Sequence, residues 1–384
     1  MKEGWIVKKL GEVCESDLGK TINKSKDKGR FYPYLCSINV LWNAFDFSTI
    51  KEAKFEETEL DKYSVSKGDL LICEGGDIGR AAIWNFDNTI LYQNALHRVR
   101  CYDNLNSMFC LYYLKYLKEK GILDSKYAKG VTIKHLVKSA LLSIPIPIPP
   151  LFEQHRIVSE LDCLNGIINK KREQLKELDA LAQSIFYDMF GDPDHTVYEV
   201  VALSNLTKYK LSYGSGASAT SYDGNIRYVR ITDIGDEGVL LGEKVSPTKV
   251  EDKYILNDGD VLFARSGATV GKTFLYESKY GKCIYAGYLI RYVADREKIL
   301  PKYLFYYTKT LYYKSFIKTN AQAVAQPNIN AQQYGNLKVC VPPLSLQQEF
   351  AEKISAIDKQ KELIKQSLAE VEDLFNSRMD YYFH

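Results

Sequence analysis

Two long stretches of the chain place apolar residues at alternating spacings of three and four, with charged residues between them. The first runs from Leu151 to about Phe190, and the second follows Pro343 to the end. This spacing forms an apolar stripe on one face of a helix that packs against another helix. We therefore predict two long helices, 151–190 and 344–384, the first ended by Gly191-Asp192-Pro193. The predicted seam between them consists of Ile157, Leu161, Leu164, Ile168, Leu175, Leu178, Ile185, Phe350, Ile354, Ile357, Ile364, Leu368, Val371 and Phe375.

The remaining residues, 1–150 and 191–343, alternate short apolar runs with Gly, Asn and Asp, which is typical of strands joined by turns. Strands are predicted at Tyr32–Val40, Asp69–Cys73, Ala81–Trp84, Leu96–Cys101, Ile226–Ile231, Asp260–Ala264, Thr273–Tyr276 and Tyr288–Val293. Helices are predicted at Ser107–Lys120 and Pro301–Lys318. The prolines of Ser143–Pro150 exclude a helix and favour an extended edge segment. Both regions are therefore predicted to be mixed α/β domains.

The two halves of the chain repeat one another. Pro149-Pro150-Leu151 returns as Pro342-Pro343-Leu344, 193 positions later, and Gly68-Asp69-Leu70 returns as Gly259-Asp260-Val261, 191 positions later. A fixed period indicates duplication of one structural unit, here a globular domain followed by a long helix. We expect an α+β fold with two globular domains, 1–150 and 191–343, separated by an antiparallel helix pair, 151–190 and 344–384, with pseudo-two-fold symmetry.

Composition narrows the class of protein without identifying a partner. The 384 residues are 46% apolar and 26% charged, as in soluble globular proteins, and the net charge is only +3. A basic cluster, Lys20, Lys24, Lys26, Lys28 and Arg30, stands out locally. It is compatible with a solvated loop and equally with a loop that contacts phosphates.

The cysteines and the apolar segments argue against several classes. Eight cysteines form no Cys-x-x-Cys pair and five histidines match no ligand spacing, so neither a metal site nor a disulfide framework is expected. The start of the chain does not resemble a signal peptide. The most apolar stretch, Ala140–Phe152, contains four prolines and is too short to span a bilayer. We therefore expect a cytoplasmic protein with no membrane association.

One glycine-rich stretch, residues 267–273, is similar to a nucleotide-binding loop. Only three residues separate Gly267 from Gly271, whereas the phosphate-binding motif needs four, and its repeat partner Gly76–Arg80 lacks the Lys-Thr pair. Two interpretations remain open. The turn can bring backbone amides and one cation, Arg80 or Lys272, to an anion, or it is a plain hairpin turn with an exposed cation. We find no hydrolase, amino-methyltransferase, metalloprotease or nuclease motif, so we predict a non-catalytic binding protein.

Polar side chains suited to reading bases cluster at matched places in the two halves. Arginine pairs with guanine edges, and asparagine or glutamine pairs with adenine edges. Each of these residues is also compatible with an ordinary surface or turn role. The candidate DNA-binding residues are Lys20, Lys24, Lys26, Arg30, Arg80, Gln93, Asn94, His97, Arg98, Arg227, Arg230, Thr232, Arg265, Ser266, Thr269, Lys272, Asn320, Gln322, Gln326 and Asn328.

Over its whole length the chain resembles the specificity subunit of type I restriction-modification systems. The resemblance is carried by the Pro-Pro-Leu-x-x-Gln entries with their long helices, at 149–190 and 342–382, and by the Gly-Asp strands with glycine turns, at 68–80 and 259–272. Segments 129–133 and 326–329 also fit. One departure is that Gln347-Gln348-Glu349 stands where the first half has Glu153-Gln154-His155.

The resemblance implies a role for every part. Each globular domain would be a target-recognition domain for one half of a split, asymmetric site in double-stranded DNA. The helices would set the gap and dock two methyltransferase subunits, which would carry S-adenosylmethionine and methylate adenine. Restriction, or translocase, subunits would use ATP and Mg²⁺ to cut DNA, and this chain would hold no cofactor or metal.

Two alternatives from other classes remain. The chain could be a stand-alone nuclease or nucleotide hydrolase that uses the 267–273 loop, or a scaffold whose globular domains bind proteins.

Overall fold

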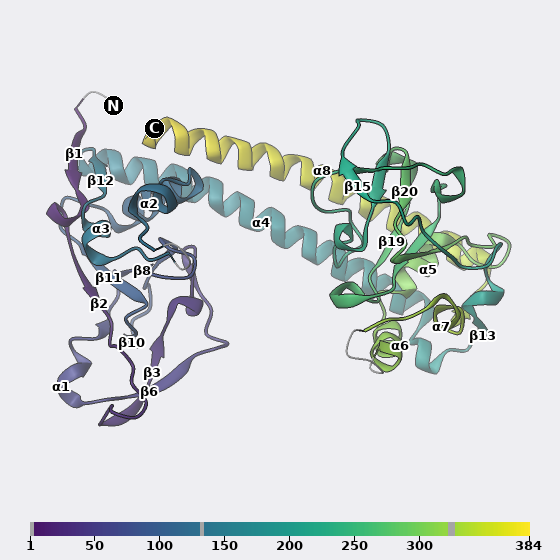
Figure 1. Ribbon diagram of the computed structural model, residues 1–384, viewed down its shortest axis with the longest axis horizontal. Coiled ribbons are helices and arrows are strands. Elements are labelled where there is room, and N and C mark those ends of the chain that lie inside the picture. The colour runs from purple at the N-terminus through teal and green to yellow at the C-terminus, as the bar shows by residue number, and fades with distance from the viewer. Residues whose placement is uncertain (1–3, 131–133, 322–326) are drawn as a thin grey trace. The chain divides into compact units, whose positions relative to one another are not determined.

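The computed structural model describes residues 4–130, 134–321 and 327–384 (Figure 1). The chain divides into two compact units. Unit 1 comprises Met1–Lys171 with Gln366–His384, and unit 2 comprises Arg172–Lys365. Each long helix is therefore shared, with part of it packed in either unit, whereas the sequence boundaries had treated the helices as separate segments.

The two long helices are present, the first with the predicted bounds and the second ending one residue earlier than predicted. They are α4 (Leu151–Phe190) and α8 (Leu344–Phe383). Gly191 follows α4 with a φ of +73°, a left-handed conformation that favours glycine at a helix end. In unit 1, Arg378 of α8 forms an ion pair with Glu160 of α4, and in unit 2 Lys361 forms one with Asp179. A second contact in each unit, Arg156 over the ring of Tyr382 in unit 1 and Phe186 against Phe350 in unit 2, shows that within each unit the two helices run antiparallel.

Most predicted seam residues lie in the interface between the helices and the unit beside them. The buried ones are Ile157, Leu161, Ile168 and Phe375 in unit 1, and Phe350, Ile354 and Ile357 in unit 2. The other predicted seam residues are partly buried. Those that pack against the same two cores are Leu164, Leu178, Ile185, Leu368 and Val371, and the other two are Leu175 and Ile364.

The end of α4 departs from the predicted seam. Phe186 and Phe190 are the buried residues there, with 0% and 3% of their surface exposed, whereas Ile185 is only partly buried. A straight helix has 3.6 residues per turn, so its apolar face drifts from a strict seven-residue repeat by about 20° per heptad. After about four heptads this drift moves the buried face by one residue and turns both rings into the core of unit 2.

Unit 1 contains two four-stranded sheets, with their strands in the following spatial order. One sheet is antiparallel: β2 (Cys14–Leu18), β11 (Leu96–Cys101), β8 (Leu70–Cys73) and β9 (Ala81–Ile83). The other contains one parallel pair, β3 with β10: β6 (Lys51–Phe55), β3 (Arg30–Leu35), β10 (Ile90–Tyr92) and β7 (Ser64–Val65). All four residues of β8 are buried, so this strand lies at the centre of the unit.

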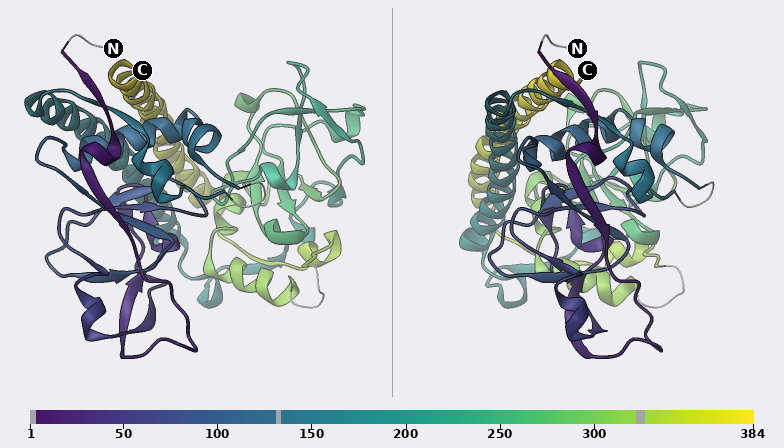
Figure 2. Two further views of the ribbon diagram at one scale, coloured as in Figure 1. Left: turned by 60° about the vertical axis from the view of Figure 1, so that its left-hand side comes forward. Right: turned by 90° about the vertical axis from the view of Figure 1, so that its left-hand side faces the viewer.

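The other elements of unit 1 flank these sheets. The proline segment forms β12 (Pro145–Ile148), which pairs with β1 (Ile6–Lys9) in a two-stranded sheet, as expected of an extended edge piece. The purple N-terminal segment carries the chain from β1 into β2 (Figure 2). The remaining elements are α1 (Glu57–Leu60), α2 (Ser107–Glu119), α3 (Lys138–Leu142), β4 (Val40–Leu41) and β5 (Ala44–Phe45). The predicted strand Tyr32–Val40 is shorter, because Ser37–Asn39 forms a 3-10 turn whose Asn39 side chain accepts from the Cys36 amide.

Unit 2 repeats the central sheet of unit 1. Its order is β14 (Ser212–Tyr213), β21 (Leu289–Tyr292), β18 (Val261–Ala264) and β19 (Thr273–Leu275), antiparallel throughout. Unit 2 also contains three separate two-stranded sheets. One is parallel, β16 (Arg227–Val229) with β20 (Cys283–Tyr285). Two are antiparallel, β15 (Ala219–Ser221) with β17 (Val245–Pro247) and β13 (Glu199–Ala202) with β22 (Lys338–Val341).

The prediction of one helix at Pro301–Lys318 is wrong. The segment forms two helices, α5 (Pro301–Tyr307) and α6 (Leu311–Ala321), and a short α7 (Ala331–Gly335) follows. The break coincides with two threonines whose hydroxyls donate to carbonyls three residues back, Thr308 to Phe305 at 2.6 Å and Thr310 to Tyr307 at 2.8 Å. Such bonds compete with the helical ladder.

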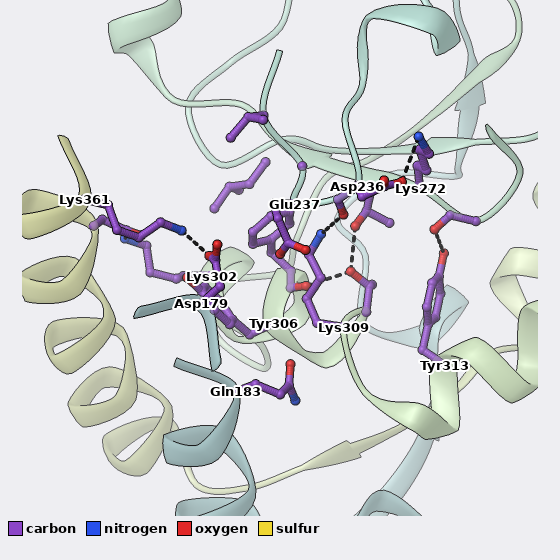
Figure 3. A pocket seen from close by; sticks show the side chains of 18 of the residues that line it. Asp179, Gln183, Asp236, Glu237, Lys272, Lys302, Tyr306, Lys309, Tyr313 and Lys361 are labelled. Atoms are coloured by element: carbon purple, nitrogen blue, oxygen red, sulfur yellow. Dashed lines mark hydrogen bonds and ion pairs between the residues drawn. The ribbon is translucent and has the colours of Figure 1, made fainter. Parts of the chain in front are cut away.

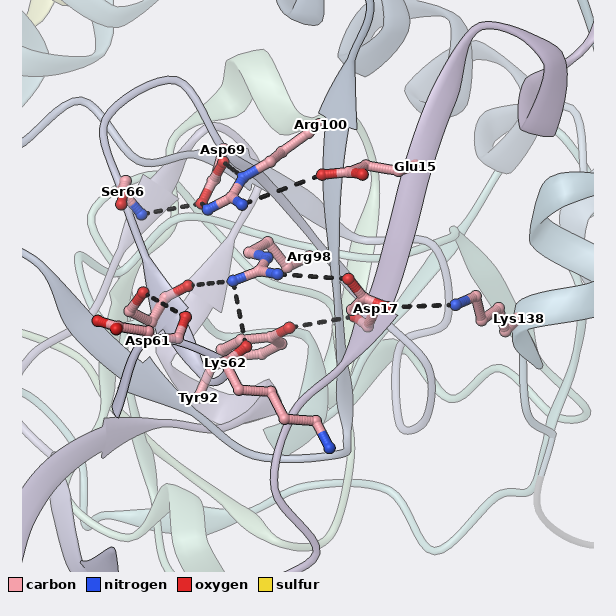
Figure 4. Close-up of polar contacts among 11 residues, drawn as sticks. Glu15, Asp17, Asp61, Lys62, Ser66, Asp69, Tyr92, Arg98, Arg100 and Lys138 are labelled. Carbon is pink, nitrogen blue, oxygen red and sulfur yellow. Dashed lines mark hydrogen bonds and ion pairs between the residues drawn. The ribbon is translucent and has the colours of Figure 1, made fainter. Parts of the chain in front are cut away.

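The repeated Gly-Asp pairs have one structural role in both units. Asp69 accepts from the Ser66 amide in its own turn at 2.8 Å and forms an ion pair with Arg100 on the adjacent strand at 2.7 Å (Figure 4). In unit 2, Asp260 accepts from the Asn257 amide at 2.6 Å and pairs with Arg291 at 2.7 Å. These contacts fix the start of the central strand, so the motif belongs to the scaffold.

A buried glutamine anchors the start of each long helix. In unit 1, Gln154 accepts from the Asn106 amide at 2.8 Å and donates to the carbonyls of Asn104 and Pro149, both at 2.9 Å. Gln154 has no exposed surface. Three bonds to backbone groups from one side chain tie the loop before α2 to the entry of α4.

Gln347 does the same in unit 2. It accepts from the Leu300 amide at 2.8 Å and donates to the carbonyls of Lys298 and Pro342, at 3.2 and 2.8 Å. It too is fully buried. The local sequence difference between the two helix entries therefore leaves this contact intact.

None of the helices within the described residues combines the length and apolar character needed to cross a membrane.

Candidate nucleic-acid interface

The loops at the far end of each central strand share one backbone arrangement. In unit 1, the Glu74 amide donates to the Ala95 carbonyl at 2.9 Å, and the Glu74 carbonyl accepts from the Leu136 amide at 2.7 Å. In unit 2, the Arg265 amide donates to Tyr288 at 3.1 Å, and its carbonyl accepts from Ile329 at 2.8 Å. Residues 74 and 265 are therefore held on both sides by matching bonds.

The arrangement extends to a neighbouring loop in each unit. The Lys20 amide donates to Tyr92 at 3.0 Å, and the Ser215 amide donates to Tyr285 at 2.8 Å. The preceding residues must be glycine, because a Cβ at Gly19 or Gly214 would lie 2.3 or 2.4 Å from a carbonyl oxygen of the facing loop. We call these loops the loop frame: Gly19–Lys20, Glu74, Gln93–Ala95 and His135–Leu136 in unit 1, and Gly214–Ser215, Arg265, Ala286–Tyr288 and Asn328–Ile329 in unit 2.

The side chains on the loop frame differ between the units. Glu74 stands where unit 2 has Arg265, His135 where it has Asn328, and Ala95 where it has Tyr288. A shared backbone with different hydrogen-bonding groups is what two readers of different sequences require, because base edges are distinguished by their donors and acceptors.

In unit 2 the frame carries an ordered cationic and aromatic group. The guanidinium of Arg265 lies over the ring of Tyr213, 4.7 Å from its centroid, and its Nε donates to Asn328 Oδ1 at 3.2 Å. The Tyr213 hydroxyl in turn accepts from the Ala331 amide at 3.0 Å. Tyr288 is 62% exposed beside this group. Stacking and an arginine fork are both common means of contacting nucleic acid.

In unit 1 the same position is acidic. Glu74 is partly buried, and this burial raises the pKa of its carboxyl, while the nearby His135 acts in the opposite direction. His135 is exposed and approaches the chain closely at Gly75, where a Cβ would lie 3.3 Å from its Nδ1. Gln93 and Asn94 lie on an adjoining loop of the frame, both partly exposed.

Four of the predicted basic DNA-binding residues, counting His97, are buried inside the fold. They form hydrogen bonds or ion pairs with the protein itself, and we assign them structural roles. Lys20 pairs with Glu59 at 2.6 Å, and His97 Nε2 lies 2.7 Å from the Leu136 carbonyl oxygen. Arg98 donates to Ser64 O at 2.5 Å and pairs with Asp17 (Figure 4). Arg227 donates to Leu241 O at 3.1 Å. A sequence pattern does not separate such residues from exposed ones of the same type.

Three other predicted cations are partly buried and already paired. Arg80 donates to the Ser37 carbonyl at 2.8 Å, Arg230 pairs with Asp233 at 2.7 Å, and Lys272 pairs with Asp236 at 2.9 Å. By contrast, Lys24, Lys26, Arg30 and Thr232 are exposed. Their contact with DNA stays a prediction.

The remaining candidates are Ser266 and Thr269 beside Arg265, Asn320 in α6, and two glutamines. Ser266 is buried and forms a β-bridge with Asn328, and Thr269 donates to the Ser266 carbonyl at 3.1 Å. Asn320 donates to Phe316 O at 2.9 Å within α6. Gln322 and Gln326 lie outside the described residues.

Sequence reasoning missed four residues on or beside the loop frame: Glu74 and His135 in unit 1, and Tyr213 and Tyr288 in unit 2. A signal was present in the repeat itself. Shifting the first half by 191 to 193 positions sets Glu74 against Arg265, and His135 against Asn328. Mismatches of this kind beside matched glycines mark positions where the two copies present different side-chain chemistry on the same backbone.

The glycine-rich stretch 267–273 lines a cavity of about 700 Å³ in unit 2 (Figure 3). The turn is a short 3-10 segment, Gly267–Thr269, and its lysine, Lys272, faces the Asp236 carboxylate. The cavity wall carries both lysines and carboxylates, and several of its lysines, Lys272 among them, are already paired with these carboxylates and not free for a triphosphate. The geometry therefore gives no support to a nucleotide site at this loop.

The same cavity holds one lysine with an unusual environment. Lys309 donates to the Asp236 carbonyl at 2.9 Å, and burial lowers the pKa of its amine to about 8. Its neighbours Lys302 and Lys361 are neutralised by Asp358 and Asp179. Within the part of the chain that the structure describes, no group of three His, Cys, Asp or Glu side chains could hold a metal ion.

Comparison with known proteins points in one direction. The sequence profile of the type I restriction modification DNA specificity domain matches residues 2–177 and again 198–373. The type I restriction enzyme MjaVIII specificity subunit of Methanocaldococcus jannaschii is 25% identical, over 96% of this chain and 90% of its own length. The EcoBI specificity subunit of Escherichia coli is 22% identical, over 82% of this chain and 73% of its own length.

Two solved structures have the same fold. The type I restriction-modification S subunit from M. genitalium superposes with a TM-score of 0.58 at 16% identity, covering 98% of this chain and 95% of its own. A chain from a structural study of complex assembly in the type I system gives a TM-score of 0.57 at 18% identity, covering 100% and 98%.

Proposed function

Since the chain belongs to the type I restriction-modification DNA specificity family, we propose that its two units each read one half of a split, asymmetric DNA site. It is a specificity subunit, a DNA-selecting and non-catalytic component. The observation that carries the proposal is the loop frame, which has the same backbone bonds in both units and different side chains at residues 74 and 265. Two equal readers would suit a palindrome, and two different ones suit an asymmetric site.

The long helices would set the gap between the two half-sites. Each contains 40 residues without interruption, which corresponds to about 60 Å of helix. Linking two weak readers through such a spacer raises the effective concentration of the second reader once the first has bound. The spacer would then select sites by gap length as well as by base sequence.

The outer faces of the same helices would dock two methyltransferase subunits. Large apolar side chains are exposed on both helices, including Phe152, 79% exposed, and Leu363, 61% exposed. Such residues support protein contacts when they lie together in a patch. These partners would bind S-adenosylmethionine and methylate adenine. Restriction subunits would use ATP and Mg²⁺, the chain itself would hold no cofactor, and the assembly would act in the cytoplasm.

Sequence-dependent DNA binding by the complex is the direct test of this function. The chain co-purified with its methyltransferase subunit should bind one duplex from a sequence pool far more tightly than its scrambled counterpart. The logarithm of the affinity should fall linearly with the logarithm of salt concentration, because phosphate contacts release counterions. Fluorescence anisotropy over a salt series measures both properties.

Two results would contradict the proposal. Equal affinity for selected and scrambled duplexes would remove sequence reading, and binding by the methyltransferase subunit alone with the same preference would assign the reading elsewhere. The methyltransferase without this chain is therefore the matched control.

A further inference from the structure

We infer that residues 265 and 74 are the base-specifying positions of the loop frame: Arg265 reads a guanine in one half-site, and Glu74 reads a cytosine in the other. This inference rests on the proposed function and adds to it the chemistry of one base in each half.

Arg265 is positioned before any ligand arrives. Its backbone is held by Tyr288 on one side and Ile329 on the other. Its side chain is fixed by the stacking on Tyr213 and by the bond from Nε to Asn328. Within residues 4–130, 134–321 and 327–384, the two terminal guanidinium nitrogens have no hydrogen-bond or ion-pair partner. An ordered arginine fork with free donors matches the O6 and N7 acceptors of guanine.

Glu74 offers the opposite chemistry from the equivalent place. Its backbone is held by Ala95 and Leu136 in the same way. Its carboxylate makes no hydrogen bond to another described residue and has His135 as its charged neighbour. A carboxylate that accepts from a base edge pairs with the N4 amino group of cytosine.

The occurrence of arginine in one unit and glutamate at the equivalent position of the other also argues against a contact with a DNA phosphate. If both units present the loop frame to DNA in the same way, a position that faces the sugar-phosphate backbone of DNA in unit 2 would face it in unit 1 as well. A carboxylate there would be repelled by the phosphates. A base edge, in contrast, presents acceptors or donors according to the sequence, so the same position can hold either residue.

The test maps methylated adenines in cells that express the chain with its methyltransferase subunit and have no other adenine methylation. Arg265→Gln should replace a required guanine by adenine, or relax it, at one position of one half-site. Glu74→Gln should replace a required cytosine by adenine, or relax it, in the other half-site, because glutamine pairs with adenine. Discrimination at the altered position should change on the order of 10- to 100-fold, while the other half and the gap stay as they were.

Arg296→Ala is the matched control. Arg296 belongs to unit 2, is exposed, and donates to the Asp258 carbonyl at 2.7 Å in the turn that precedes the central strand, whereas Arg265 follows that strand. Its loss should leave the motif unchanged. Should Arg265→Gln yield no soluble chain, Arg265→Lys keeps the charge over Tyr213 but loses the fork, and should weaken discrimination at the same guanine.

The outcomes separate this inference from the function on which it rests. A wild-type chain that directs no two-part motif would refute the proposed function. A wild-type two-part motif that survives in both variants, with methylation lowered equally at all sites, would show phosphate contacts and overturn the inference alone. A change at a base other than guanine for Arg265, or other than cytosine for Glu74, would overturn the stated base assignment.

Discussion

Leucine in place of Gln154 or Gln347 should destabilise the chain by roughly 3 kcal/mol or more. Each glutamine satisfies three backbone groups, one amide and two carbonyls, of which one carbonyl is buried and the other two groups are partly buried. Leucine fills a similar volume but leaves those groups without partners, and each unsatisfied buried group costs about 1–3 kcal/mol. Chemical denaturation of the full-length chain should show a lower midpoint for each variant, and the double variant should lose more than either.

Gln348→Ala is the control for this prediction. Gln348 is adjacent in sequence, but it lies on the exposed face of α8 and donates only to Glu352, at 3.1 Å. Its loss should change stability by less than about 0.5 kcal/mol. If Gln347→Leu lowered the free energy of unfolding no more than Gln348→Ala, the start of α8 would not depend on the buried Gln347 side chain. The proposed stabilisation of both helix entries by a buried glutamine would then be wrong.

Removing seven residues from each long helix should shorten the gap that the complex recognises without altering the bases at either end. Suitable stretches are Lys171–Glu177 and Glu362–Leu368, which hold no fully buried residue; Leu368 alone packs, partly buried, against the core of unit 1. Seven residues preserve the phase of the seam and remove about 10 Å of helix. The preferred gap should shrink by at most about three base pairs, at 3.4 Å per step, as measured by mapping methylated adenines.

The control for the deletion keeps helix length and changes only surface chemistry. Glu173→Ala with Lys176→Ala removes an exposed ion pair from the same stretch, and it should leave the gap unchanged. A deletion variant that methylates the original gap at the original frequency would exclude the helices as the spacer. Loss of one half-site's bases in the deletion variant would instead mean that the helices take part in reading.

The periodic parts of the fold could be predicted from the sequence. The bounds of α4 and α8, the extended segment at Pro145–Ile148 and the duplicated Gly-Asp strands follow from spacing, proline and glycine, because these constraints are local. The break between α5 and α6 could not be predicted in this way. It depends on threonine hydroxyls bonding to carbonyls, in competition with an otherwise good helical pattern.

The candidate interface was only partly predictable, for a different reason. Arg98 and Arg265 look alike in the sequence, yet Arg98 is buried and bonded to Asp17 and the Ser64 carbonyl, whereas the terminal nitrogens of Arg265 have no partner among the described residues. Which arginine is sequestered depends on strands distant in the chain. Tyr213 is placed beside Arg265 by pairing of β14 with β21, a long-range contact that no local pattern encodes.

The central claim is that two units built on one frame read two different half-sites, and one measurement tests it most directly. Methylated adenines should be mapped across the genome of a host that carries the wild-type chain and its methyltransferase subunit as the sole source of adenine methylation. The account predicts one motif in two parts, with unlike half-sites and a gap of fixed length. A single continuous motif, or two identical half-sites, would contradict it.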